Sequence, residues 1–382
     1  MRTRLCSAVA CIALVLGTVF AVPATAAKPA PSKQAAAAAR VLMNSYDPKT
    51  AYWDSSWWNS AVATTTVIDY MRETGDLQYL PQVEHTFVKD QKPYPAGTLS
   101  GDPIEGDFIS RAIDDTEWWG LAWVDAYDLT GQQKYLKMAT KIGNYVASYW
   151  DPSTCGGGVW WNTDKTYKNA ITNGLYVRLA ASLADRTHRK TWLARASTAW
   201  NWYLHSGLIG PNNLVNDGLT DDCTNNGQTV WTYNQGLAIG GAVEVWRATG
   251  DKSALAEAKV LADAAVTSTT LNTDGVLTES CDPVTVPGCD DNQKQFKGIF
   301  MRYLGDLNTV AHGRYSQYIN AQIASLQTND SNVHHEYGIN WHGWATSDHP
   351  NTRDWRTQAS ALEALLARPA LARAGATANR QR

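Results

Sequence analysis

The chain has 382 residues, of which 44% are hydrophobic, and this composition excludes wholesale disorder and allows a large buried core. Its formal net charge is −3 and no basic patch stands out, which argues against a nucleic-acid-binding protein. Trp and Tyr reach 17 each while Phe is limited to 5. Rings with a polar group suit stacking on sugars in wet clefts, although most of the Trp should fill the core.

The first 26 residues have the features of a secretory signal peptide. Two arginines precede an apolar run over residues 8–22, and Ala24-Thr25-Ala26 offers small residues for cleavage. We expect cleavage near Ala26 and secretion. An uncleaved anchor is disfavoured because the run is short for a bilayer span, and no later segment could cross a membrane. One catalytic domain is expected over residues 27–382, with roughly the last 12 residues disordered.

A weak repeat marks helix–helix turns along the chain. Its full copies are Thr74-Gly75-Asp76, Thr130-Gly131-Gln132 and Thr249-Gly250-Asp251, and degenerate copies begin at Thr187 and His312. In the full copies, the glycine can end one helix in the left-handed conformation and the next residue can cap the following helix. Intervals of roughly 55–65 residues indicate a helical array.

The helices on either side of these turns differ in kind. After Gly131, apolar residues recur at helical spacing on one face, whereas residues 118–129 are apolar nearly all round, which predicts a helix buried on both sides. Inner helices should begin near residues 56, 109, 168, 231, 293 and 354. Outer helices should begin near residues 34, 76, 132, 188, 252 and 313. The prediction is an all-α fold, an (α/α)6 barrel of six inner and six outer helices in which the outer helix at 34 packs beside the last inner one. Two separate helical bundles are the alternative.

Long connections lead into the inner helices, and the turns that leave them are short. The long connections cover roughly residues 90–108, 151–167, 207–230, 268–292 and 328–353. Because long loops in a compact domain usually carry function, the site is expected where the inner helices begin.

Four cysteines lie outside the first 26 residues, all of them in these loops. An even count in an exported chain suggests two disulfides, for which three pairings can be drawn. Short spacing favours Cys281–Cys289, which leaves Cys155–Cys223. A zinc site is the alternative, but no C-x₂-C spacing is present.

Asp114 and Asp115 stand at the head of the second inner helix, in the segment IDDTEWWGLAWVDAY from Ile113. Capping would need one acidic residue, and two adjacent ones, followed by Glu117 and two tryptophans, favour a catalytic pair. Glycoside hydrolysis uses two carboxyls, one to protonate the leaving oxygen and one to attack or to activate water. Neighbouring helical residues can hold carboxyls near the roughly 5–5.5 Å of retaining enzymes, whereas the roughly 6.5–9.5 Å of inverting enzymes would need opposed rotamers.

This segment resembles the paired-aspartate signature of glycoside hydrolase family 76, the endo-acting α-1,6-mannanases. Segments that resemble the same family lie at or within other expected inner helices: KNAITNGLYVRLAASLA from Lys168, VWTYNQGLAIGGAVEVW from Val230, FKGIFMRYL from Phe296 and QASALEALL from Gln358. The family's fold is an (α/α)6 barrel, in agreement with the helix pattern. The resemblance implies a secreted, retaining endo-hydrolase of α-1,6-mannosidic linkages, with Asp114 as nucleophile and Asp115 as acid/base.

The resemblance also implies a set of substrate-binding residues. Asp217, in VNDGL, matches an acidic loop position and would hold a sugar hydroxyl, and Trp119 and Trp161 would stack on sugar rings. The residues that would head inner helices and face the cleft are Asn173, Tyr233, Asn234, Gln235 and Lys297. For each of these the alternative is a role as cap, core residue or loop anchor.

No metal or cofactor is expected. HHEYGINWHGW from His334 matches no zinc motif and is interpreted as a polar cleft wall, and the acidic loops DGLTDD and CDDN lack the calcium ligand ladder. The expected partner is an α-mannan polysaccharide or oligosaccharide, and the protein is expected to be a monomer.

Other functions fit less well. A terpene cyclase would need an acidic residue where Trp118 stands, and a signal peptide is out of character for it. A polysaccharide lyase would need basic residues near the pair to neutralise uronates. A transglycosylase of the same family that joins cell-wall glycans, and a non-catalytic mannan-binding wall protein, are the remaining alternatives, and mannan turnover would separate them from a hydrolase.

Overall fold

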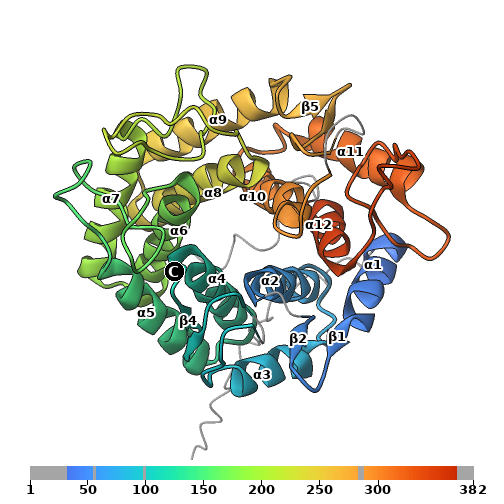
Figure 1. The fold of residues 1–382 in the computed structure, drawn as a ribbon, viewed down its shortest axis with the longest axis horizontal. Coiled ribbons are helices and arrows are strands. Elements are labelled where there is room, and N and C mark those ends of the chain that lie inside the picture. Colours follow the sequence, from blue (N-terminus) through green and yellow to red (C-terminus); the bar gives the residue numbers. More distant parts are fainter. Residues whose placement is uncertain (1–31, 55–56, 98–99, 283–287, 368–382) are drawn as a thin grey trace, which may run out of the picture.

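Twelve α-helices form two concentric rings in the computed structural model, which describes residues 32–54, 57–97, 100–282 and 288–367 (Figure 1). The inner ring consists of α2 (Trp57–Thr74), α4 (Ile113–Thr130), α6 (Ala170–Thr187), α8 (Thr232–Thr249), α10 (Phe296–Val310) and α12 (Trp355–Leu366). The outer ring consists of α1 (Lys33–Asn44), α3 (Leu80–Lys89), α5 (Gln133–Ala147), α7 (Lys190–His205), α9 (Lys252–Thr267) and α11 (Ser316–Ser325). The predicted (α/α)6 barrel is confirmed.

The two rings differ in burial as their sequences predict. In α5 the buried side chains repeat on one face, among them Met138, Ile142 and Val146. In α4 nearly every side chain from Ile113 to Ala126 is buried, because the helix is covered on both sides. Some inner helices touch through their backbones: a Cβ at Gly298 of α10 would lie 2.4 Å from the Cα of Ser360 in α12.

The prediction that glycines end the helices at these turns is confirmed, whereas of the three predicted caps only Asp251 caps the following helix: Gln132 makes no capping bond and Asp76 lies before the start of α3. Gly131 and Gly250 adopt φ values of 70° and 77° after α4 and α8, so each ends its helix in the left-handed conformation. His188 takes the same place after α6 with φ 53°. The helix expected near residue 76 begins later, at Leu80, because Pro81 in its first turn fixes the start of the helix.

The ring closes between its first and last helices. Figure 1 shows α1 beside α12, as predicted, and the Nε2 of Gln358 donates a hydrogen bond to the carbonyl of Ala38 at 3.1 Å. No described helix combines the length and apolar character needed to span a bilayer. The predicted signal peptide, residues 1–26, and the last dozen residues lie outside the described residues.

Short antiparallel hairpins lie in three of the connections between helices, before α2, α4 and α10. They are β1 (Tyr46–Asp47) with β2 (Tyr52–Trp53), β3 (Ile104–Gly106) with β4 (Ile109–Ser110), and β5 (Asn272–Thr273) with β6 (Val276–Leu277). The β3–β4 hairpin explains why the helix expected near residue 109 begins at Ile113 instead. Both predicted disulfides form, Cys155–Cys223 and Cys281–Cys289.

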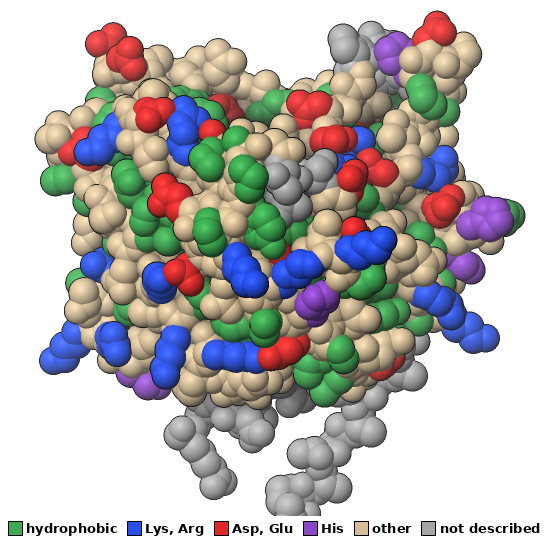
Figure 2. Space-filling view, turned by 60° about the horizontal axis from the view of Figure 1, so that its bottom comes forward, with side chains coloured by type: hydrophobic (Ala, Val, Ile, Leu, Met, Phe, Trp, Pro, Cys, Tyr) green, Lys and Arg blue, Asp and Glu red, His purple; other side chains and the backbone are tan. Residues whose placement is uncertain are grey.

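Ion pairs join the ends of the inner helices that lie away from the long loops. Arg302 of α10 contacts Asp69 of α2 at 2.6 Å and Asp125 of α4 at 2.7 Å. Arg186 of α6 contacts Asp128 of α4 at 2.6 Å and also pairs with Glu244 of α8. Arg247 of α8 contacts Asp306 of α10 at 2.5 Å, and Glu363 of α12 lies 3.8 Å from Arg302. We call these residues the basal ion-pair ring. On the side of the barrel in Figure 2, Lys and Arg gather toward the lower end, and Asp and Glu toward the upper end.

Candidate active site

A cleft of about 660 Å³ opens where the inner helices begin. Its wall comes from the first turns of α2, α4, α6, α8 and α10 and from the loops that precede them. Aromatic rings and carboxyls dominate the lining: Trp57, Trp58, Trp118, Trp161, Tyr167, Trp231, Tyr233 and Phe296, with Asp102, Asp114, Asp115 and Asp217. The position of the cleft agrees with the prediction from the long loops.

Asp114 and Asp115 lie in the first turn of α4, where the helix dipole favours negative charge. Their surroundings differ. The Oδ1 of Asp114 accepts a hydrogen bond from the backbone N–H of Asp115 at 3.0 Å, and its Oδ2 accepts one from the indole N–H of Trp161 at 3.1 Å. Among the described residues, no comparable donor reaches the Asp115 carboxyl. Hydrogen bonds to an ionised carboxylate favour ionisation, so Asp114 is the carboxyl of the pair that ionises more readily.

The causes of the pKa shifts of the two carboxyls support the same assignment. Burial raises the pKa of Asp114, and the two hydrogen bonds counteract this rise. Burial also raises the pKa of Asp115, and the negative charges of Asp114 and Asp102 raise it further. Like charges side by side cannot both ionise easily. The first proton of the pair therefore leaves Asp114, while Asp115 keeps its proton to higher pH.

Asp217 lines the same cleft from the loop before α8, where its backbone carbonyl accepts a hydrogen bond from the N–H of Ala170 at the start of α6. The hydroxyl of Tyr167 donates to its Oδ2 at 2.6 Å, and Asn226 in turn donates to the hydroxyl of Tyr167 at 2.7 Å. Burial raises the pKa of Asp217, and the hydrogen bonds from Tyr167 and Trp231 counteract this rise. These contacts hold the Asp217 carboxyl at a fixed place in the cleft wall.

Aromatic side chains from four inner-helix starts form the rest of the wall. Trp58 stacks on Trp118 with ring centroids 5.8 Å apart, and Tyr233 stacks on Phe296 at 3.7 Å. Trp231 meets the same Phe296 ring edge-on at 5.6 Å. Such flat apolar faces beside carboxyls are typical of carbohydrate sites.

The structure thus brings five of the predicted site residues to the cleft: Asp114, Asp115, Trp161, Asp217 and Tyr233. It does not bring Trp119 there. That side chain is fully buried and packs against Tyr52, Trp57, Phe108 and Trp123. The expectation that Trp119 stacks on a sugar is therefore corrected, because the neighbouring Trp118, about 100° around the helix, is the one that faces the cleft.

Four predicted contacts at the inner-helix heads are corrected as well, because they lie behind the cleft wall. Asn173 and Gln235 each bond both backbone groups of a loop residue, Val159 and Val215 respectively. Lys297 pairs with Asp282 and donates to the carbonyl of Ile339. Asn234 is fully buried and does not line the cleft. Most of them act as loop anchors.

Sequence reasoning missed several lining residues, namely Trp58, Asp102, Trp118, Tyr167, Trp231 and Phe296. Three of them, Trp118, Trp231 and Phe296, lie within two positions of a predicted residue, and helix geometry decides which neighbour faces inward. The aromatic content of the first turns was an available signal. Asp102 lies in a loop whose path the sequence does not reveal.

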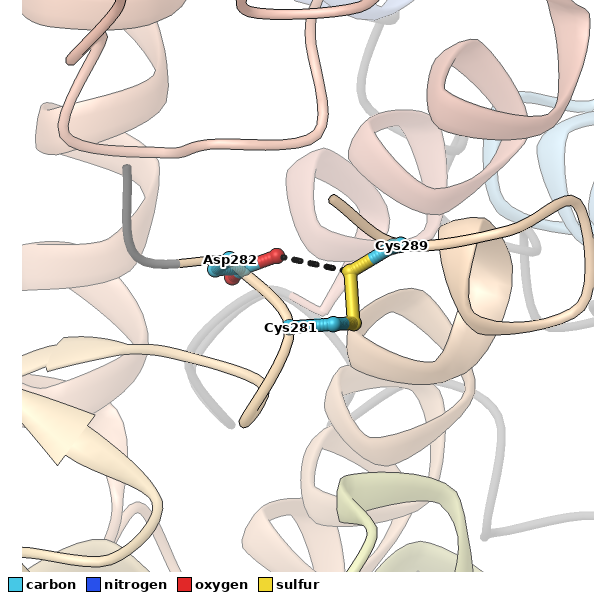
Figure 3. A group of neighbouring side chains, drawn as sticks. All are labelled: Cys281, Asp282 and Cys289. Carbon is cyan, nitrogen blue, oxygen red and sulfur yellow. Dashed lines mark hydrogen bonds between the residues drawn. A yellow bond between two sulfur atoms is a disulfide. The ribbon is translucent and has the colours of Figure 1, made fainter. Parts of the chain in front are cut away.

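A group of possible metal ligands occurs among the described residues at Cys281, Asp282 and Cys289, none of which lines the cleft (Figure 3). The two cysteines are bonded to each other, so neither offers a thiolate, and the Sγ of Cys289 lies 3.5 Å from the Oδ1 of Asp282. A disulfide sulfur carries no hydrogen, and metal binding to cysteine needs the thiolate. The chemistry of this group does not fit a metal. The loop from His334 forms no such group within the described ranges.

Comparisons with known proteins identify the family of this chain. The model of glycosyl hydrolase family 76 matches residues 32–379. The mannan endo-1,6-alpha-mannosidases of Eremothecium gossypii and Saccharomyces cerevisiae are 29% and 28% identical to this chain, each over 75% of it. The chain spans 67% and 66%, about two thirds, of the length of these relatives.

A solved structure offers a nearly full-length match. The α-1,6-mannanase of Salegentibacter sp. HEL1_6 is 26% identical, with a TM-score of 0.73, over 89% of this chain and 99% of that chain. An inactive variant of that mannanase, in which two consecutive aspartates are replaced by alanine, was solved with α-1,6-mannotetrose and matches with 25% identity and the same TM-score, over 89% of this chain and 98% of that chain.

Proposed function

Because this chain belongs to glycosyl hydrolase family 76, we propose that it is an endo-acting hydrolase that cleaves α-1,6-mannosidic linkages in mannan with retention of configuration. The names of the relatives and of the solved mannanase support the sugar and the linkage. The observation that carries the catalytic assignment is the unequal hydrogen bonding of two adjacent carboxyls. One is held as an anion and the other keeps its proton, which are the two states that a retaining mechanism needs.

In the first step, the Asp114 carboxylate attacks the anomeric carbon of the mannose and forms an ester bond. The glycosidic C–O bond breaks, and its electron pair stays with the leaving oxygen. Asp115 transfers its proton to that oxygen, so the shortened chain leaves as an alcohol. Trp161 orients Asp114 through its indole N–H, and the bond weakens as the carboxylate becomes an ester.

In the second step, Asp115 is ionised and acts as a base. It takes a proton from a water molecule while the water oxygen attacks the same anomeric carbon, and the ester bond to Asp114 breaks. Two displacements restore the α configuration. Asp217 would hold a sugar hydroxyl, and the stacked pairs Trp58–Trp118 and Tyr233–Phe296 would support sugar rings.

Export is part of the same proposal. We infer that residues 1–26 are removed near Ala26 and that a single barrel domain is secreted as a monomer. The two disulfides support an oxidising compartment. N-terminal sequencing of the protein collected outside the producing cells would test the cleavage, and a mature chain that still begins at Met1 would contradict it.

Incubation with linear α-1,6-mannotetraose tests the activity, with product sizing. The expected result is shorter α-1,6-mannooligosaccharides from the wild type and at least a thousandfold lower rate after Asp114→Asn, with a melting temperature at or above that of the wild type. Products longer than the substrate would identify the transglycosylase alternative. Absence of any product from a folded sample would favour the alternative of a non-catalytic mannan-binding protein.

A further inference from the structure

All the charged side chains that line the cleft are acidic. Its lining contains four carboxyls, those of Asp102, Asp114, Asp115 and Asp217, and no Lys or Arg among the described residues. With Asp115 protonated, an ionised Asp102 and Asp114 already make the cavity anionic. A cavity whose charges have one sign focuses a field that repels ligands of the same sign.

Basic residues close in sequence to the lining residues have other partners; Lys294, for example, pairs with Asp291 and Asp354. Arg111 does not line the cleft, and its guanidinium is shared between Asp102 at 3.5 Å and Asp164 at 2.6 Å, so this trio retains a net negative charge. The Nζ of Lys168 donates to the backbone carbonyls of Asp151, Thr154 and Gly157. Lys297 is fully buried in its pair with Asp282.

Asp102 lines the cleft on the side where α4 begins. It precedes α4 together with Ser100 and Gly101, which also line the cleft. Its carboxyl lies 3.5 Å from the guanidinium of Arg111, two residues before α4 begins, so it stands near the start of the helix that carries Asp115. Because Asp115 is the group proposed to protonate the leaving oxygen, Asp102 stands beside the departing part of the substrate.

We propose that Asp102 is a specificity-determining residue that makes the leaving-group side of the cleft accept uncharged sugars and reject those bearing a carboxylate or phosphate. This inference rests on the proposed mannanase activity. A like charge within several ångströms across a partly wet cleft costs an anionic substrate roughly a factor of ten in affinity. The cleft offers such a group no cation to compensate.

Two derivatives of α-1,6-mannotetraose test the proposal, one with its reducing end oxidised to a carboxylate and one with it reduced to an alcohol. They match in size and differ in charge at the end that leaves. We expect kcat/KM to be about tenfold higher for the alcohol derivative at low ionic strength. The ratio should shrink in 0.5 M salt, because screening weakens charge repulsion.

Asp102→Asn should bring the ratio close to one, whatever it does to either rate alone. Asp222→Asn removes the same charge from an exposed loop residue that does not line the cleft, and it should leave the ratio unchanged. Equal rates on both derivatives with the wild type, or an unchanged ratio in Asp102→Asn, would overturn the inference. Failure to cleave unmodified mannotetraose would instead overturn the proposed function.

Discussion

Asp114 and Asp115 are neighbours with different surroundings, and this difference predicts different variants. Asp114→Asn should abolish turnover of every substrate, because no carboxylate remains to attack. Asp115→Asn should lose about 10²–10⁴-fold on mannotetraose, but far less of the first step on a 2,4-dinitrophenyl mannobioside, whose leaving group needs no proton. A burst of dinitrophenol measures that step.

The controls for this prediction are structural. Both variants should melt at or above the wild-type temperature, because two adjacent acidic groups are a cost to stability. If Asp115→Asn lost the dinitrophenyl substrate as completely as Asp114→Asn, the two roles would not be separable. If one variant unfolded while the other remained fully active, the pair would be structural.

The hydrogen bond from Trp161 predicts a change in pH dependence. Activity is lost as pH falls through the pKa of Asp114, because the nucleophile becomes protonated. The indole N–H lowers that pKa, so Trp161→Phe should move the acid limb of kcat/KM to higher pH while keeping the ring. Trp160→Phe, at the adjacent ring that does not line the cleft, is the control and should leave the limb in place. An acid limb unmoved in Trp161→Phe would exclude this role.

At this scale, the sequence identified the right helix turns more often than the right side chains. Tyr233 faces the cleft, whereas Asn234 and Gln235 in the same turn are buried. Lys297 was predicted, but Phe296 lines the wall. Adjacent helical positions differ by about 100° in direction, and the small tilt that decides between them depends on packing that sequence alone does not define.

At the scale of elements, amide side chains on the inner helices hold the long loops in place through hydrogen bonds to the loop backbone. Gln235 at the start of α8 accepts from the N–H of Val215 at 2.7 Å and donates to its carbonyl at 2.8 Å. Asn173 of α6 makes the same pair of bonds with Val159. These loops carry Asp217 and Trp161. The partners lie 20 and 14 residues away along irregular chain, so sequence patterns could not pair them.

Loss of one such anchor should affect both stability and substrate binding. Gln235→Ala leaves the buried N–H and C=O of Val215 unpaired, which should lower the free energy of unfolding by about 2–4 kcal/mol. It should also raise KM, because Asp217 follows Val215 in the same loop. Gln133→Ala, on the exposed start of α5, is the matched control and should change either quantity little. Urea unfolding and initial rates measure both, and a Gln235→Ala protein as stable as this control would refute the anchor.

At the scale of the whole molecule, the barrel has two ends with different chemistry. One end holds the cleft, and the other holds the basal ion-pair ring. The alternation of doubly covered and amphipathic helices was readable from sequence, because hydrophobic burial sets it. The ring was not readable, because its partners, such as Asp69 and Arg302, are 233 residues apart.

The basal ion-pair ring predicts a contrast between two substitutions. Arg302→Met removes a buried cation that contacts both Asp69 and Asp125, and should destabilise the fold by about 3–5 kcal/mol. Glu363→Gln should cost less than about 1 kcal/mol at pH 7, because burial raises the pKa of Glu363 and keeps it neutral. Urea unfolding of both variants measures the contrast, and equal losses would contradict it.

The retaining mechanism is tested most directly by the anomeric configuration of the first product. Proton NMR records this configuration while α-1,6-mannotetraose is being cleaved. We predict α-mannose at the new reducing end, before mutarotation, because Asp114 and Asp115 perform two successive displacements. A first product in the β configuration would mean a single displacement by water. It would contradict Asp114 as nucleophile and require a base elsewhere in the cleft, with Asp217 the first candidate.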